Sequence, residues 1–201
     1  MTKVYFDNAA TTPISEDVAD IVSQVMKNNF GNPSSIHSFG RESRSLIEGT
    51  RKSIADELNV KSSEIIFTSG GTESNNMIIK GAVETHKIER IITTKIEHKA
   101  VLVASESCKI KYDIELVYIN VNNQGFPDLI ELENLLSSSD KKTLVSLMHI
   151  NNEIGSITDL SEVGNICKKF NALFHSDTVQ TIGHYKIDLS KINIDFITCS
   201  A

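Results

Sequence analysis

The chain has 201 residues, 40% of them hydrophobic and 23% charged, with a net charge of −6 at pH 7. This composition is typical of a globular protein with one sizeable domain. The sequence has no basic cluster interleaved with aromatic residues, which argues against a nucleic-acid partner. Because no apolar run is long enough to span a membrane and the first residues lack the apolar core of a signal peptide, we expect a cytoplasmic protein.

The amino-terminal part predicts an extended arm followed by two helices. The arm is expected over residues 1–14, since the chain is polar after Phe6 and Pro13 closes the segment. Helices are expected over residues 15–28 and 39–58, joined by a connection rich in turn-forming residues.

Short apolar runs then alternate with helical patterns. Strands are expected over residues 64–68, 90–94, 114–119, 143–149, 172–175 and 194–199, and helices over residues 72–86, 98–109, 128–136 and 159–170. Asp128 and Asp159 each stand three residues before a glutamate, a spacing typical of helix starts. The alternation predicts an α/β fold with a mostly parallel sheet that helices cover on both faces.

The first candidate site lies where an apolar strand runs into Gly70 and Gly71 and Thr72 opens a helix. Glycines let the backbone approach an anion, and the free N–H groups of a helix start donate to it. The segment lacks the dinucleotide fingerprint and the P-loop lysine, so a phosphate monoester fits better than a dinucleotide or a triphosphate. An ordinary strand-to-helix turn with Thr72 as the N-cap explains the pattern equally well.

Two further candidates follow predicted strands. His98 stands where an imidazole could stack on a planar cofactor and move protons, although a surface or capping histidine is the simpler interpretation. Asn151 and Asn152 offer uncharged donors and acceptors, and turn formation alone explains them equally well.

The fourth candidate is the acid–amide pair Asp177 and Gln180, at the end of a predicted buried strand. A carboxylate placed there can pair with a protonated ring nitrogen, which is how pyridoxal phosphate becomes an electron sink. Gln180 could then reach the ring hydroxyl. The alternative is that Asp177 caps a helix.

The three cysteines are widely spaced and odd in number, which predicts reduced thiols and neither a disulfide framework nor a zinc site. Cys167 and Cys199 are expected to be buried packing residues, whereas Cys108 could be exposed.

Taken together and in this order, the motifs resemble the cysteine desulfurases, the NifS/IscS-like branch of the class V aminotransferases. The segments that carry the resemblance cover residues 5–13, 30–37, 68–75, 97–101, 149–155 and 175–183. The resemblance implies the large domain of a fold-type I pyridoxal phosphate enzyme over residues 15–201. It also implies a homodimer that takes sulfur from L-cysteine, leaves L-alanine and passes the sulfur to an acceptor or scaffold protein for iron–sulfur cluster or thio-cofactor assembly.

The resemblance also implies roles for individual residues. Gly71, Thr72 and Ser200 match positions that hold the cofactor phosphate, and His98 matches the residue that stacks on the ring and assists proton transfer. The remaining matches are Asn152 and Gln180 near the ring oxygen and Asp177 at the ring nitrogen.

The family's cofactor-bearing lysine, its sulfur-accepting cysteine and its small carboxyl-terminal domain match positions beyond Ala201. We therefore expect the 201 residues alone to lack desulfurase turnover and to leave apolar surface bare. A selenocysteine lyase or another class V enzyme is an alternative, and a non-catalytic binding or scaffold protein is a second.

Overall fold

The computed structural model describes residues 3–8 and 10–200, so Met1, Thr2 and Ala9 in the predicted arm and Ala201 in the predicted domain lie outside the described residues. The chain separates into two compact units, one up to residue 65 and one from residue 66. The division into an arm over residues 1–14 and a domain over residues 15–201 stays a prediction. Among the described residues, no helix is both long and apolar enough to cross a membrane.

The first unit consists of the two predicted helices and a short 3-10 turn. They are α1 (Glu16–Asn28), α2 (Ser38–Leu58) and η1 (Ser62–Glu64). The Ser15 hydroxyl accepts from the Val18 N–H to start α1, and His37 Nδ1 accepts from the Gly40 N–H to start α2. No side chain of α1 is buried, although the helix is strongly amphipathic.

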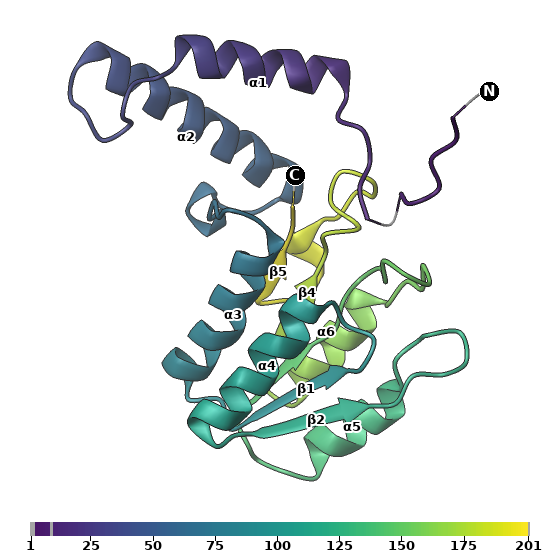
Figure 1. Ribbon diagram of the computed structural model, residues 1–201. Coiled ribbons are helices and arrows are strands. Elements are labelled where there is room, and N and C mark those ends of the chain that lie inside the picture. Colours follow the sequence, from purple (N-terminus) through teal and green to yellow (C-terminus); the bar gives the residue numbers. More distant parts are fainter. Residues whose placement is uncertain (1–2, 9, 201) are drawn as a thin grey trace. The chain divides into compact units, whose positions relative to one another are not determined.

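The second unit holds a five-stranded parallel sheet in the order β2-β1-β3-β4-β5 (Figure 1). Its strands are β1 (Arg90–Thr94), β2 (Glu115–Ile119), β3 (Thr143–Ser146), β4 (Leu173–Asp177) and β5 (Phe196–Thr198). Its helices are α3 (Gly71–His86), α4 (Lys99–Tyr112), α5 (Leu129–Ser137) and α6 (Leu160–Lys169), with the 3-10 turn η2 (Leu189–Lys191).

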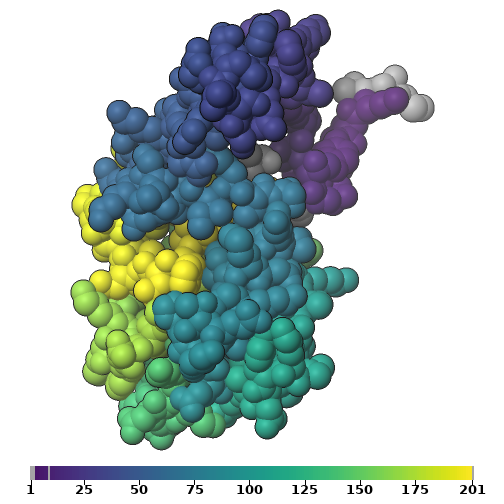
Figure 2. Space-filling model, turned by 90° about the vertical axis from the view of Figure 1, so that its left-hand side faces the viewer, coloured from purple at the N-terminus to yellow at the C-terminus, as the bar shows by residue number. Residues whose placement is uncertain are grey.

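Two apolar clusters cover the two faces of the sheet. Consecutive residues of a strand point to opposite faces, so Ile91 packs with the cluster of α3 and α4 while Ile92 packs with that of α5 and α6. Figure 1 shows these helix pairs on opposite sides of the strands, and Figure 2 shows the carboxyl-terminal strand region beside α3. The predicted α/β fold with a parallel sheet covered on both faces is thereby confirmed.

The predicted helix starts at Asp128 and Asp159 are confirmed. The Asp128 carboxylate accepts from the N–H groups of Ile130 and Glu131, both at 3.0 Å. The Asp159 carboxylate likewise accepts from the N–H groups of the second and third helix residues. Each carboxylate satisfies two donors that the helix itself leaves free, and its charge suits the positive end of the helix dipole.

The strand predicted over residues 64–68 is wrong. Glu64 closes η1, Ile65 after it is extended, and residues 65–68 belong to no strand of the described sheet. The apolar run Ile65–Ile66–Phe67 suggested a strand, yet a strand requires a hydrogen-bonded neighbour in addition to suitable side chains. Ile66 and Phe67 are instead 66% and 48% exposed.

Two of the three cysteine placements differ from expectation. Cys167 is buried as predicted, but Cys108 is also buried and Cys199 is exposed. Cys108 lies on the inner face of α4, whereas Cys199 follows the short edge strand β5 and so leaves the core. All three thiols are free.

A disulfide-exchange reagent is therefore expected to label one thiol in the folded chain and three after unfolding in urea. Labelling of Cys199 should be slower than that of free cysteine, since partial desolvation of its thiol and the charge of Asp177 raise its pKa. Replacing Cys199 by serine should abolish the native-state labelling. Labelling of two or more thiols in the folded chain would contradict the observed burial.

Candidate functional site

Polar residues gather at the carboxyl edge of the sheet, where ligands bind in open α/β folds. Because all five strands are parallel, the segments that follow them emerge at the same edge. His98 follows β1, Asn152 follows β3, Asp177 ends β4 and Ser200 follows β5. Residues from four separate parts of the sequence thus meet at one edge.

The start of α3 closes on the segment that follows β4. A Cβ atom on Gly71 would lie 2.9 Å from Val179 Cγ2 and 3.7 Å from Thr198 Cγ2, so glycine allows the close approach. The N–H groups of Gly71 and Thr72 belong to the first turn, which has no acceptors within the helix. The N-cap is Gly70 with φ +155°, so the interpretation of Thr72 as the N-cap is wrong.

The Asp177 carboxyl group is buried and held from two sides. Its Oδ2 accepts from Asn75 Nδ2 at 2.8 Å, and its Oδ1 accepts from the Val179 N–H at 3.0 Å. The following residues form a turn, so Asp177 does not cap a helix. Gln180 lies half-buried in that turn.

His98 is exposed and serves as the N-cap of α4, as the simpler interpretation had it. Its Nδ1 accepts from the Ala100 N–H at 3.2 Å. The proton of a neutral His98 ring therefore resides on Nε2. This cap does not conflict with a role in a site, because the ring remains accessible.

Glu97, next to His98, is a buried acid that ties two strand ends together. Its Oε1 accepts from the Thr94 hydroxyl at 3.1 Å and from the Met148 N–H at 2.9 Å, while Oε2 has no hydrogen-bond partner in the part of the chain that the structure describes. Burial raises the pKa of Glu97 to about 8, and the charge of Asp177 adds to the rise. Glu97 is thus mostly neutral at pH 7.

The paired asparagines have different environments. Asn151 is buried, and its Nδ2 donates to the Ile96 carbonyl at 2.8 Å. Its Oδ1 accepts from the N–H groups of Glu153 and Ile154, so Asn151 acts as a turn former. Asn152 is half-buried, and its Nδ2 donates to Glu153 Oε1. Asn151 thereby fixes the loop that carries Asn152 to the loop that carries His98.

The contacts that join the site pass through Asn75, Glu97 and Asn151. The sequence alone named Asn151 as a candidate but assigned no part to Asn75 or Glu97. A signal for Asn75 was present, because it stands three and four residues after Thr72 and Gly71 and so shares their face of the helix. No comparable signal marked Glu97, since its burial depends on Met148, which is distant in sequence.

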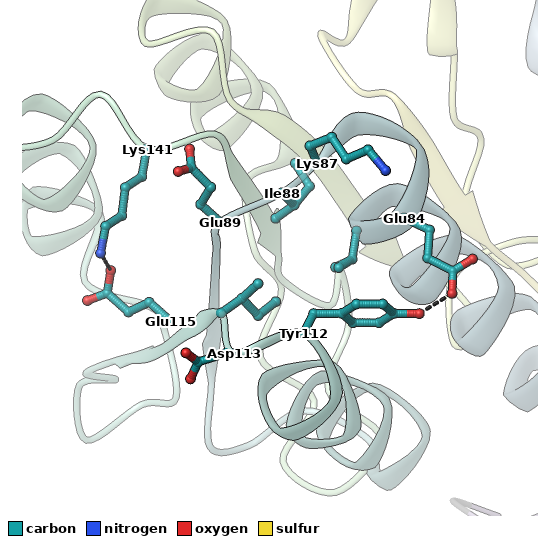
Figure 3. A pocket seen from close by; sticks show the side chains of 10 residues that line it. Glu84, Lys87, Ile88, Glu89, Tyr112, Asp113, Glu115 and Lys141 are labelled. Atoms are coloured by element: carbon teal, nitrogen blue, oxygen red, sulfur yellow. Dashed lines mark hydrogen bonds and ion pairs between the residues drawn. The ribbon is translucent and has the colours of Figure 1, made fainter.

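A depression of about 750 Å³ lies at the opposite edge of the sheet, beside the segments that lead into β1 and β2 (Figure 3). Two of its acidic side chains have partners within the protein. Glu84 accepts from Tyr112 and Lys111, and Lys141 Nζ lies 3.0 Å from a Glu115 oxygen. The candidate residues His98, Asp177 and Ser200 lie at the carboxyl edge and not here, so we place the functional site at the carboxyl edge.

The residues at that edge suit pyridoxal phosphate. A phosphate group requires free N–H donors at a backbone that it can approach, as the start of α3 provides. The pyridine nitrogen requires a carboxylate, and Asp177 is only 5% exposed. Each Asp177 oxygen carries one of the two hydrogen bonds described above, so acceptor capacity remains for a ring N–H.

The chain matches the family "Aminotransferase class-V" over residues 4–201. It is 46% identical over 204 residues to "Cysteine desulfurase IscS" of Dictyoglomus turgidum, covering 99% of this chain and 50% of that protein. It superposes on a solved "NIFS-LIKE PROTEIN" with a TM-score of 0.93 at 40% identity, covering 99% of this chain and 55% of that one. It also superposes on the solved structure "SspA in complex with cysteine", with a TM-score of 0.88 at 31% identity, covering 98% and 56%.

The chain therefore belongs to the class V aminotransferase family. The relatives at this level of identity are cysteine desulfurases by name, and the chain spans about half of their length.

Proposed function

We propose that this chain is the cofactor-binding part of a cysteine desulfurase that uses pyridoxal 5′-phosphate to take sulfur from L-cysteine and leave L-alanine. The observation that supports it best is the buried Asp177 carboxylate, bonded to the same helix that begins at the Gly71–Thr72 turn. A relative whose structure was solved in complex with cysteine supports the choice of substrate.

The cofactor phosphate would be held by the first N–H groups of α3, at Gly71 and Thr72, and by Ser200 after β5. Asp177 would pair with the ring nitrogen, and Gln180 and Asn152 would contact the ring oxygen. When bound, the cofactor supplies an electron sink for the substrate carbons.

His98 would stack on the ring and exchange a proton with the substrate. Because Nδ1 is engaged by the Ala100 N–H, Nε2 is the atom from which His98 would donate or to which it would accept a proton. The cap at Nδ1 thereby orients the ring and defines its tautomer.

The remaining parts of the proposal rest on the family. We propose a homodimer in the cytoplasm that hands sulfur to an acceptor or scaffold protein for iron–sulfur cluster or thio-cofactor assembly. Support comes from the likeness to proteins named cysteine desulfurase.

An absorbance titration with pyridoxal phosphate tests the cofactor site. Replacing Asp177 by alanine should weaken binding by about 10- to 100-fold, because a hydrogen bond to a charged group is lost. Glu133→Gln, an exposed change on α5, should bind within about twofold of the parent chain. Identical curves for the parent and Asp177→Ala would remove the site assignment while leaving the fold unaffected.

A further inference from the structure

We propose that Asn75 is a positioning residue that aims the Asp177 carboxylate at the cofactor ring and couples it to the phosphate-binding turn. The inference rests on the proposed function and assigns a role to a side chain that does not touch the cofactor. Asn75 lies on α3 and Asp177 on β4, 102 residues further along the chain.

Burial of Asn75 at its contact with Asp177 supports this role. Asn75 is 1% exposed, and its Nδ2 donates to Asp177 Oδ2 at 2.8 Å. A carboxylate oxygen can only accept here, so the amide nitrogen must face it, and a bond to a charged acceptor is stronger than one between neutral groups. Asn75 Oδ1 is buried and has no hydrogen-bond partner among the described residues. This uncompensated atom indicates that the residue is not there to stabilise the core alone.

The Asp177 carboxylate is fixed from two sides. The Val179 N–H holds Oδ1 from the strand side while Asn75 holds Oδ2 from the helix side, so the carboxylate cannot rotate without breaking a bond. Asn75 shares a helix face with Gly71 and Thr72 and lies about one turn further on. One rigid helix would thus hold the phosphate with its first turn and the ring-pairing acid with its second.

The negative charge of Asp177 also bears on the role of Asn75. Three titratable groups meet here: Asp177, the buried Glu97 after β1 and the Cys199 thiol after β5, and the last two each sense the negative charge of Asp177. An N–H donor from Asn75 offsets that charge without adding a group that titrates. Removing the donor also frees the Asp177 carboxylate to rotate away from the ring nitrogen, and this loss of orientation should lower its preference for a protonated ring nitrogen.

The test compares the parent chain with Asn75→Leu, which keeps the approximate size but has no donor. Asn76→Ala, the neighbouring asparagine whose amide bonds only the Thr72 carbonyl, is the matched control. Three quantities are measured: affinity for pyridoxal phosphate, competition by inorganic phosphate, and the pH midpoint of the absorbance change of the bound cofactor.

In Asn75→Leu the cofactor affinity should fall about tenfold and the pH midpoint should drop by about one unit. The affinity for inorganic phosphate should stay within about twofold of the parent, and Asn76→Ala should match the parent in all three measurements. Equal losses of cofactor and phosphate affinity would mean that Asn75 only holds α3 in place, and no loss would mean that Asp177 needs no aiming. Either result overturns the inference.

If Asn75→Leu does not fold, NMR measurements on chains that keep Asn75 test the inference instead. The side-chain amide signal of Asn75 in a ¹⁵N NMR spectrum should shift on adding pyridoxal phosphate and differ in Asp177→Ala, and a signal that responds to neither overturns the inference. Failure of the proposed function is distinguishable, because Asp177→Ala would then bind the cofactor as tightly as the parent.

Discussion

Replacing Glu97 by glutamine is expected to leave the stability of the second unit nearly unchanged near pH 4.5 and to raise it above pH 8. In the folded chain burial raises the pKa of Glu97 from 4.5 to about 8. The folded state therefore holds a proton that the unfolded state releases, and stability is lost as the pH rises between these values. The loss from this one group could reach about 5 kcal/mol, an upper limit.

Glutamine is a suitable replacement because it is neutral at every pH and keeps an oxygen for the Thr94 hydroxyl and the Met148 N–H. Urea unfolding at a series of pH values measures the difference between the two proteins. Glu133→Gln, which removes an exposed pair with Lys169, serves as the control and should change stability by less than about 1 kcal/mol. A constant difference between Glu97→Gln and the parent across this pH range would show that Glu97 is ionised in the fold.

Acid is expected to destabilise the same unit through His175, the second large effect. His175 is fully buried on β4, with Nδ1 2.9 Å from the Ser146 hydroxyl and Nε2 3.2 Å from the Thr198 hydroxyl. Burial lowers its pKa from 6.5 to about 3. The unfolded state therefore binds a proton that the folded state does not, and stability is lost as the pH falls from 6.5 towards 3.

NMR spectroscopy of the isotope-labelled histidine rings tests this directly. The His175 ring should stay neutral in the folded chain at pH values where the same ring is protonated in the chain unfolded in urea. His175→Gln should remove up to about 5 kcal/mol of the acid sensitivity, at the cost of about 1–3 kcal/mol at neutral pH for imperfect hydrogen bonds. A ring that titrates near 6.5 in the folded chain contradicts the prediction.

The two effects oppose each other between pH 4.5 and 6.5. As the pH rises through this range, the Glu97 effect lowers the stability of the fold and the His175 effect raises it. Above that window the Glu97 effect remains, and below it the His175 effect remains. Together these two groups favour a stability maximum in the mildly acidic range. Both groups lie in the sheet region that forms the candidate site. Ionising either buried side chain there lowers the stability of the fold.

The sequence by itself determined the layers of the second unit. Apolar runs such as residues 116–119 and helix starts such as Asp128 and Asp159 are local signals, because side-chain periodicity and capping act within a few residues. The same order of motifs also placed His98, Asn152 and Asp177 after their strands. Parallel strands then bring those residues to one edge by topology alone.

Only the tertiary structure decided which side chains hold the site together. The bonds from Asn75 to Asp177 and from Met148 to Glu97 join residues 102 and 51 positions apart, and no local pattern encodes such a meeting. The same applies to the burial of Cys108 and to residues 64–68, whose apolar character did not supply a neighbouring strand. Burial and pairing are properties of the packed chain, since they depend on what the rest of the fold brings alongside.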